Sequence, residues 1–425
     1  MSAATHEVTL EMLREARSRQ AHHLRQTETA LSRTFSQLAG SQVFLKTENL
    51  QQTGSFKARG ALNKLFAMPP TERHRGVITA SAGNHGQGVA FAASLLNVPS
   101  TIVMPLGAPL AKVTAAQGYG ARTELCGSSY DDAHHHALQR ADRDGLVYVH
   151  AFDDPLVVAG QGVVALEMLE QVPDLDVLVV PVGGGGLIAG MAVAAKAIRP
   201  RLRLIGVQAA GAAACAESFH SGALASTEQV TTIADGIAVK RPGELTFGII
   251  RELVDDMVSV RDEAISQAIV LLMERTKLVV EGAGAVGLAA LLEQKIAHRQ
   301  GRVGLVLSGG NIDLNLLGKV IQYGMISAGR YLALRFWLDD KPGQLHGITR
   351  LLAEHSINIL HVGIHRMGPY MALHKVELEL IVETRDHAHG QEVLELVRAA
   401  GYNAEEAVNE RAEFLYPFPD KEAAR

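Results

Sequence analysis

One lysine of this chain lies where its amine could act as a nucleophile. Lys57 stands directly after Phe56, between Gly54 and Gly60, in a segment that predicts a loop running into a helix. An apolar neighbour partly desolvates an amine, which keeps it reactive enough to form a Schiff base with a carbonyl compound. Taken alone, the pattern fits a solvated surface lysine better, because lysines are common and mostly exposed. Other residues must decide between these interpretations.

A run of glycines, Gly183 to Gly186, follows an apolar stretch that predicts a buried strand. Residues without side chains let backbone N–H groups crowd around a phosphate, and the helix expected after them adds a favourable dipole. The run lacks the G-x-G-x-x-G spacing of a dinucleotide-binding turn and the Lys-Ser/Thr pair of a P-loop. We therefore expect it to bind a single phosphate monoester, with a tight turn alone as the alternative.

Two further loops offer polar groups. Residues 81–88 present Ser81, Asn84 and His85 at an expected helix N-terminus, which suits a carboxylate. An Asn-capped turn explains this loop equally well. Residues 308–311 place the Ser308 hydroxyl at the end of a strand beside two glycines, and here an ordinary turn is the stronger interpretation.

Each of these loops follows an apolar stretch and precedes a helical pattern. The stretches are 77–80, 177–182 and 303–307, each followed by a glycine-containing turn and helix-forming residues. This alternation predicts an α/β fold whose parallel sheet is covered on both faces. Ligands of open α/β sheets bind at the carboxyl ends of the strands, where all three loops would lie.

The pattern changes after Met325. Residues 326–330 predict a short linker, and the residues beyond it predict a second, α+β domain with an antiparallel, ferredoxin-like sheet. Its expected elements, in β-α-β-β-α-β order, are a strand at 331–337, a helix containing Leu345, strands at 357–364 and 372–382, a helix at 391–400 and a short last strand. The final residues, 411–425, predict a loose tail.

The composition limits the possible functions. The 425 residues predict about two or three domains. A net charge of −5 provides no basic surface for nucleic acid, and the apolar stretches are too short to cross a membrane. Cys126 and Cys215 are widely spaced and predict neither a disulfide framework nor a metal site. Together with an N-terminus unlike a signal peptide, these features predict a cytoplasmic protein.

The segment around Lys57 and the three loops after it, in this order and spacing, resemble the threonine dehydratase (threonine ammonia-lyase) branch of the fold-type-II pyridoxal 5′-phosphate (PLP) enzymes. The segments that carry the resemblance are SFKARG, SAGNHGQG, the glycine run, SGGNID, FDDPLVVAGQG, TIADGIAVKRPG and VVEGAGAVGLAAL, which together span almost all of residues 30–325. The residues after the linker resemble a single ACT regulatory domain, with DKPGQL as its strand-helix turn.

This resemblance implies a domain plan. A tryptophan synthase β-like catalytic domain of two parallel-sheet subdomains would occupy 1–325, with the small subdomain, about 55–150, inserted within the large one. The ACT-like domain would occupy 331–410. The implied oligomer is a homodimer or homotetramer.

The resemblance also assigns residues to the site. Lys57 and Ser81 would be catalytic, with Lys57 holding PLP and acting as the base at the substrate Cα. The residues implied to bind the cofactor are Phe56, Lys57, Asn84, Gly183, Gly184, Gly185, Gly186, Leu187 and Ser308. Those implied to bind the substrate are Ser81, Ala82, Asn84, His85 and Glu281, with a structural carboxylate as the alternative for Glu281. No metal is expected.

The implied reaction is β-elimination from L-threonine to give 2-oxobutyrate and ammonia, and from L-serine to give pyruvate, with threonine deamination as the first step of isoleucine biosynthesis. Ser308 at the pyridine nitrogen would leave the ring neutral. A neutral ring is a weaker electron sink, which favours prompt loss of a β-group over transamination. The bound phosphate would protonate the leaving hydroxide. The preference for threonine or serine stays open, because it depends on one methyl group.

Three alternatives are open. Serine racemases place a serine where this chain has Ala82, and an alanine cannot move a proton. Their divalent cation is held by carboxylates where Gln208 and Ala214 stand here, and these are poor ligands. Cysteine synthases share the lysine, although residues 232–243 and 279–287 favour the dehydratases. An amino-acid sensor with a vestigial catalytic domain is the third.

The ACT-like domain implies an effector. In the resemblance, a small amino acid binds in a crevice lined by Asp340 to Leu345 and Asn358 to Val362. Isoleucine, as the end product, is the expected inhibitor. The biosynthetic long form carries two such domains and this chain one, so valine or no effector stays possible.

Overall fold

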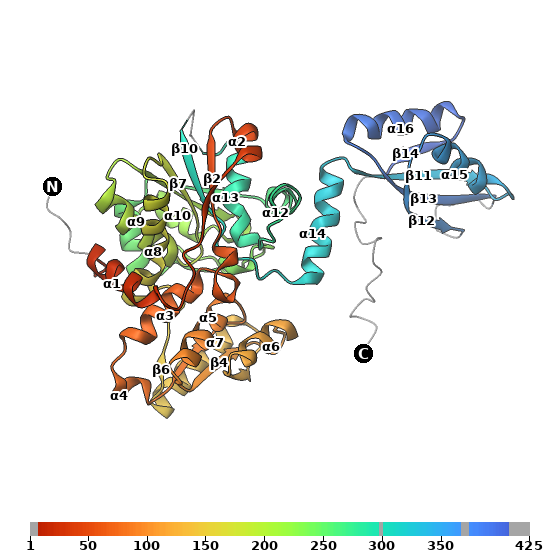
Figure 1. Ribbon diagram of the computed structural model, residues 1–425. Coiled ribbons are helices and arrows are strands. Elements are labelled where there is room, and N and C mark those ends of the chain that lie inside the picture. The colour runs from red at the N-terminus through yellow and green to blue at the C-terminus, as the bar shows by residue number, and fades with distance from the viewer. Residues whose placement is uncertain (1–6, 297–300, 367–373, 408–425) are drawn as a thin grey trace. The chain divides into compact units, whose positions relative to one another are not determined.

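The apolar stretches at 177–182 and 303–307 become central strands of a parallel sheet because both of their faces are covered. In the computed structural model, which describes residues 7–296, 301–366 and 374–407, the chain divides into two compact units, Met1–Leu317 and Gly318–Arg425. The first unit contains two sheets and the second contains one (Figure 1). The predicted tail at 411–425 lies outside the described residues.

The larger sheet of the first unit has the strand order β1-β2-β10-β7-β8-β9. Strand β1 runs antiparallel to β2, and all the other neighbours are parallel. The strands are β1 (Thr29–Ser32), β2 (Gln42–Lys46), β7 (Val177–Pro181), β8 (Arg203–Ala209), β9 (Asp256–Val260) and β10 (Arg302–Val306).

Helices cover both faces of this sheet. Gly304 of β10 lies against Met168 of α8, whereas Val179 and Leu305 point toward Gly287 of α13. Alternate residues of one strand therefore meet different helices, which is why its sequence is apolar throughout. The helices of this part are α1 (Leu10–Gln20), α2 (Arg33–Ala39), α8 (Pro155–Gln171), α9 (Gly186–Ile198), α10 (Ala214–Ser221), α11 (Glu244–Leu253), α12 (Asp262–Thr276) and α13 (Gly282–Leu292).

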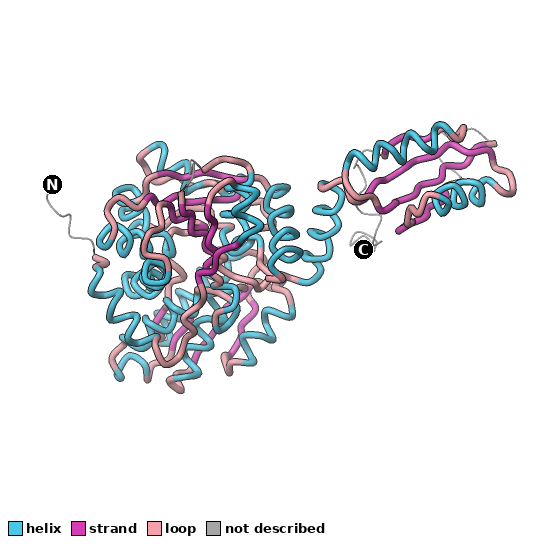
Figure 2. The backbone as a smooth tube through the Cα atoms, turned by 45° about the horizontal axis from the view of Figure 1, so that its top comes forward, coloured by secondary structure: helices cyan, strands magenta, loops and turns pink. Residues whose placement is uncertain are grey.

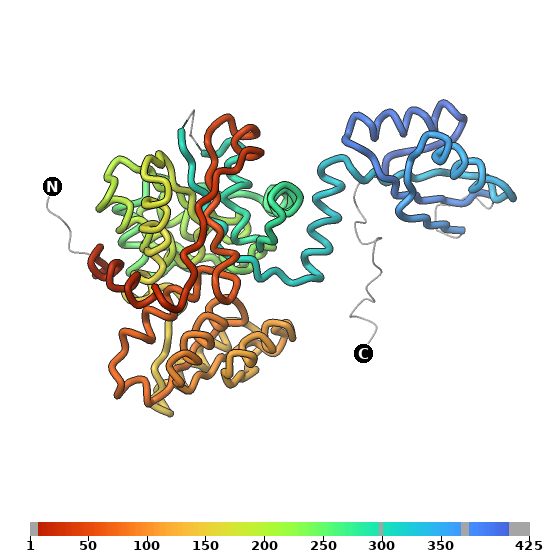
Figure 3. The backbone as a smooth tube through the Cα atoms, in the orientation of Figure 1, coloured from red at the N-terminus to blue at the C-terminus, as the bar shows by residue number. Residues whose placement is uncertain are grey.

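A smaller parallel sheet, in the order β5-β4-β3-β6, is built from the chain between β2 and α8. This segment, orange in Figure 3, forms a lobe of its own beside the larger sheet. Its elements are α3 (Lys57–Ala67), α4 (Pro70–Arg73), β3 (Val77–Ala80), α5 (Asn84–Leu95), β4 (Ser100–Met104), α6 (Leu110–Gly118), β5 (Arg122–Leu125), α7 (Tyr130–Asp144) and β6 (Val147–Tyr148). Short 3-10 turns, η1 (Glu48–Leu50), η2 (Gln52–Gly54), η3 (Ala210–Ala212) and η4 (Asp235–Ile237), complete the unit.

The second unit has an antiparallel sheet in the order β12-β13-β11-β14, whose strands are drawn in magenta in Figure 2. Its elements are β11 (Tyr331–Asp339), α15 (Gln344–Glu354), β12 (Ile359–His365), β13 (Lys375–Glu383), α16 (His387–Ala399) and β14 (Ala404–Glu406). Alternate residues of β11, from Leu332 to Leu338, are buried, as the predicted half-buried strand requires. The predicted β-α-β-β-α-β order is confirmed.

Two details of the second unit differ from prediction. The linker expected at 326–330 begins as helix, because α14 (Leu314–Ser327) continues until Gly329 adopts the left-handed conformation with φ 67°. Helix α16 starts at His387 rather than near Gln391, because the Asp386 side chain caps it by accepting from the backbone N–H of His389.

Within the described residues, no helix combines the length and apolar character that a membrane span needs.

Candidate active site

Lys57 is the first residue of α3. Its Nζ donates a hydrogen bond to the carbonyl oxygen of Ala151 at 2.8 Å and lies 5.3 Å from the centre of the Phe56 ring. Burial of the amine lowers the pKa of Lys57 to about 8, although Glu281 partly opposes this shift. Near neutral pH a usable fraction of the amine is therefore uncharged, as a nucleophile requires.

Two asparagines and a carboxylate form a chain of hydrogen bonds beside this amine. The Asn84 Nδ2 donates to Glu281 Oε1 at 2.7 Å, and the Asn311 Nδ2 donates to Asn84 Oδ1 at 2.8 Å. Asn311 also donates to the Thr53 carbonyl oxygen at 2.7 Å. These bonds leave the Asn84 amide only one orientation, with its N–H groups toward Glu281.

Glu281 is a buried carboxyl at the start of α13. Burial raises the pKa of Glu281 to about 7, and Asp235 adds to the shift, whereas the hydrogen bond from Asn84 opposes it. The structure therefore brings Glu281 next to Asn84 and within electrostatic reach of Lys57. Both protonation states of Glu281 are populated at physiological pH, which suits a group that exchanges a proton.

The four glycines connect β7 to α9. Gly185 has φ 97°, a backbone conformation that residues other than glycine rarely adopt. A Cβ on Gly186 would lie 2.9 Å from the carbonyl oxygen of Phe152, and one on Gly184 would run into the Phe152 ring. The loop thus has no room for side chains on this side. Leu187 is buried in the first turn of α9, whose unpaired N–H groups favour an anion.

The loop at 81–88 turns at the N-terminus of α5. The Ser81 Oγ accepts from the backbone N–H of Gly83 at 3.1 Å, and Ala82 is half-buried next to it. The His85 Nε2 lies 3.0 Å from the carbonyl oxygen of Val149, which makes Nε2 the donor. A carboxylate at this loop would therefore meet the backbone N–H of His85 rather than its Nε2.

Burial, and then the charge of Lys57, lower the pKa of His85 to about 3. The imidazole is therefore neutral. Its Nδ1 is buried and has no hydrogen-bond partner within the described part of the chain. An acceptor left in this way marks a place where a ligand donor would be stabilising.

Ser308 follows β10 and is buried. Its carbonyl oxygen accepts from the backbone N–H of Phe56 at 3.0 Å, which ties the residue to the segment that carries Lys57. The next residue, Gly309, accepts from the backbone N–H of Glu281 at 3.0 Å. Ser308 is thus brought beside Phe56, Lys57 and Glu281, although they are far apart in sequence.

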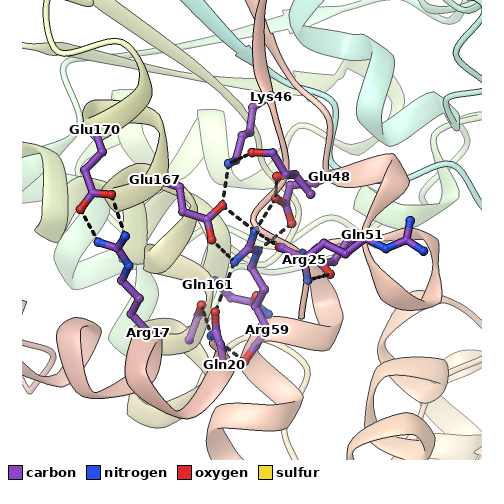
Figure 4. A network of polar contacts seen from close by, with 12 residues as sticks. Arg17, Gln20, Arg25, Lys46, Glu48, Gln51, Arg59, Gln161, Glu167 and Glu170 are labelled. Carbon is purple, nitrogen blue, oxygen red and sulfur yellow. Dashed lines mark hydrogen bonds and ion pairs between the residues drawn. The ribbon is translucent and has the colours of Figure 1, made fainter. Parts of the chain in front are cut away.

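A buried ionic cluster anchors the helix that carries Lys57 (Figure 4). The Arg59 guanidinium donates two hydrogen bonds to Glu48 and two to Glu167, all at 2.8 Å, and Lys46 Nζ donates to Glu167 at 2.6 Å. These four side chains are at most 6% exposed. Two cations and two carboxylates balance each other, so α3 is fixed to β2, η1 and α8 without a net buried charge.

The sequence analysis did not include several residues that shape the site. Asn311 was named only as the end of a loop. Phe152 and Asp153 entered only as the start of the FDDPLVVAGQG segment, and His150 and Ala151 were not named. A possible signal for Asn311 was its place in SGGN, directly after the glycines. Asp235 is another such residue, since it raises the pKa of Glu281 and is held by Lys112 at 2.5 Å.

The lowered pKa of the Lys57 amine and the side-chain-free loop at the N-terminus of α9, in an α/β unit of two sheets, fit a fold-type-II PLP-dependent enzyme. The family described as pyridoxal-phosphate dependent enzyme matches residues 21–309, and the chain belongs to it. The ACT domain family matches residues 333–401. The predicted fold class and cofactor are therefore confirmed. The Lys57 amine, the side-chain-free loop and the buried His85 Nδ1, which has no partner among the described residues, fit PLP.

Two relatives named for the same activity resemble most of the chain. It is 47% identical over 391 residues to a protein named L-threonine ammonia-lyase from Geobacter sulfurreducens, covering 92% of this chain and 97% of that one. It is 44% identical over 395 residues to the L-threonine ammonia-lyase of Thermotoga maritima, covering 93% and 98%. Among solved structures, maize serine racemase aligns with a TM-score of 0.71 at 37% identity, covering 76% of this chain and 99% of that one.

The contact between Gly184 and Phe152 gives a test of whether the glycine loop binds the phosphate of PLP. In Gly184→Ala the added Cβ would force the loop or the ring to move, and overpacking of this kind costs about 1–3 kcal/mol. We expect the dissociation constant of PLP to rise about tenfold or more. Gly248→Ala is the control, because a Cβ there meets nothing within 4 Å. Titration of the apoenzyme with PLP measures both, and equal affinities would contradict a role for this loop.

Proposed function

We propose that this chain converts L-threonine to 2-oxobutyrate and ammonia, and L-serine to pyruvate and ammonia. The observation that carries the proposal is the lysine amine at the start of α3, held by the Ala151 carbonyl opposite the glycine loop. The proposal is supported by the likeness to two L-threonine ammonia-lyases over nearly their whole length, including the ACT unit.

In this proposal Lys57 removes the proton from the substrate Cα. The amine has a pKa of about 8, so it can be uncharged when it accepts the proton and charged afterwards. Bound PLP supplies the electron sink that makes the Cα proton acidic. The Ser81 loop and the N-terminus of α5 orient the substrate carboxylate, since backbone N–H groups at a helix start favour an anion.

Asn84 and Ser308 would hold the two polar edges of the cofactor ring. The Asn84 Nδ2 carries two N–H groups and donates one of them to Glu281, so the second could donate to a ring oxygen. Ser308 would meet the ring nitrogen through a neutral hydroxyl. Glu281, with a pKa of about 7, lies where it could assist proton transfer near the substrate hydroxyl.

Serine racemization is the second candidate, because the maize enzyme has a similar fold at 37% identity. Racemization needs a second acid or base on the opposite side of the substrate, and Ala82 has no proton to move. We therefore expect elimination to dominate. A chiral assay in which D-serine forms faster than pyruvate would reverse this order.

The wider setting belongs to the same proposal. We place the enzyme in the cytoplasm as a homodimer or homotetramer, at the first step of isoleucine biosynthesis. Its catalytic domain would span 1–325 and its regulatory domain 331–410. Isoleucine or valine would bind the crevice at Asp340 to Leu345 and Asn358 to Val362, where Asp340 is paired with Arg366 at 2.5 Å.

The test is the formation of 2-oxo acid by the holoenzyme from threonine and from serine, each with and without isoleucine or valine. We expect product from both substrates, and inhibition by one effector. Specificity should be modest, because one methyl group is worth about 1–3 kcal/mol. A protein that binds PLP but releases no 2-oxo acid would contradict elimination. Unchanged kinetics with both effectors would remove only the regulatory part.

A further inference from the structure

The turn at 150–153, between β6 and α8, contacts the reactive amine. Its Ala151 carbonyl oxygen is the acceptor for Lys57 Nζ at 2.8 Å. A lysine that acts as a base must have a defined place when it is not bonded to the cofactor. The position of this one carbonyl therefore sets where the free amine lies.

The same turn also packs against the glycine loop, Gly183 to Gly186. The Phe152 ring packs against Gly184, and the Phe152 backbone lies against Gly186. Asp153 accepts hydrogen bonds from the backbone N–H groups of Glu244 and Thr246, at 3.0 and 3.1 Å, at the start of α11. The Thr246 hydroxyl in turn donates to the Gly184 carbonyl oxygen at 2.7 Å. The turn thus connects the amine to both sides of the glycine loop.

His150 holds this turn through a single ring nitrogen. Its Nδ1 accepts from the backbone N–H of Phe152 at 3.2 Å and from that of Asp153 at 2.8 Å. The ring also packs edge-to-face on Phe152, with centroids 4.7 Å apart at 86°. Because both bonds are donated to Nδ1, that nitrogen must be unprotonated and the proton must be on Nε2.

The surroundings favour this neutral form. Burial, the largest effect, lowers the pKa of His150, and the nearby charges of His134 and Lys57 act in the same direction. Asp153 and Asp154 oppose them. Protonation at Nδ1 would turn the acceptor of two N–H groups into a donor facing them, which the turn cannot accommodate.

We propose that His150 is a positioning residue, whose neutral imidazole fixes the turn at 150–153. The turn thereby places the Ala151 carbonyl that holds Lys57 and the Phe152 ring that packs against the glycine loop. The inference rests on the proposed role of Lys57. It does not depend on which amino acid the enzyme uses.

Two substitutions separate this role from simple packing. In His150→Asn the side-chain Oδ1 stands near the place of Nδ1 and can accept the same two N–H groups. In His150→Leu the bulk is kept and the acceptor is lost. His135→Asn, on the exposed face of α7, is the control for the chemical change alone.

The experiment measures PLP affinity of the apoenzyme, the absorption band of the bound cofactor, and thermal unfolding. We expect His150→Leu to weaken PLP binding about 10- to 100-fold and His150→Asn by less than about 3-fold, the difference of two lost hydrogen bonds. In the apoenzyme with 15N-labelled histidine, the His150 signal, assigned by its absence in His150→Asn, should show an unprotonated Nδ1.

Three results would overturn the inference. They are a protonated Nδ1 at neutral pH, a His150→Asn variant as impaired as His150→Leu, and wild-type affinity for PLP in His150→Leu. If PLP binds but Lys57→Ala keeps the wild-type absorption band, the proposed role of Lys57 fails instead, and the 15N result still decides the state of His150.

Discussion

Replacing Lys57 with alanine is expected to slow the formation of 2-oxobutyrate from threonine by about 10⁴-fold or more, because in the proposed function this residue supplies both the covalent link and the base. The absorption band of the lysine-linked cofactor should disappear as well. The free amine is placed by the Ala151 carbonyl at 2.8 Å, and alanine has no amine to put in that position. Steady-state rates and the absorption spectrum of the purified variant measure the two effects.

Lys64→Ala is the matched control for this variant. Lys64 lies on the same helix and pairs with Asp154 at 2.6 Å. We expect Lys64→Ala to keep the band, because the Lys64 amine is bound to Asp154 and not to the Ala151 carbonyl that holds Lys57. If Lys57→Ala kept the band, another lysine would have to carry the cofactor.

Arg59→Met is expected to lower the free energy of unfolding of the first unit by about 3–5 kcal/mol, because it leaves two buried carboxylates without their shared partner. Burial alone would raise the pKa of Glu48. The charge and the hydrogen bonds of Arg59 outweigh this effect, so the pKa of Glu48 stays below its usual range. Methionine keeps much of the volume, so the effect reports the lost charge rather than a cavity. Urea unfolding of the apoenzyme measures it.

An exposed pair provides the comparison. Arg17 pairs with Glu170 on the surface between α1 and α8, where the two side chains are 39% and 52% exposed. Arg17→Ala should cost about 0–1 kcal/mol. An Arg59→Met variant no less stable than Arg17→Ala would show that the cluster does not anchor α3.

The sequence predicted the sheets well because their signals are local. The stretch 177–182 is apolar throughout, as a strand with both faces covered requires. The alternation of Leu332, Leu334 and Phe336 likewise identified a half-buried strand, which the structure extends to Asp339. In both strands, the type of each residue and its place in the local pattern are enough to predict whether it is buried.

The ionic cluster could not be predicted in this way. Lys46, Glu48, Arg59 and Glu167 are charged residues, and single charged residues predict an exposed position. Their burial depends on pairing between Arg59 and Glu167, which are 108 positions apart. Only the folded chain shows that the four charges cancel.

The same limit applies to the orientation of polar side chains in the site. Asn84 was expected near the cofactor, but its orientation is set by Asn311 and Glu281 from two distant loops. His85 was expected at the substrate carboxylate, and the structure directs its Nε2 to Val149 instead. Which atom of a side chain is available depends on partners that the local sequence does not identify.

The position of the cofactor on the chain is the most direct test of this account. Borohydride reduction of the holoenzyme, followed by proteolysis and mass spectrometry, locates the lysine to which the cofactor becomes fixed. We predict a single pyridoxyl group on the peptide that contains Lys57. A pyridoxyl group on a different lysine, or no labelled peptide from protein with bound PLP, would contradict the account.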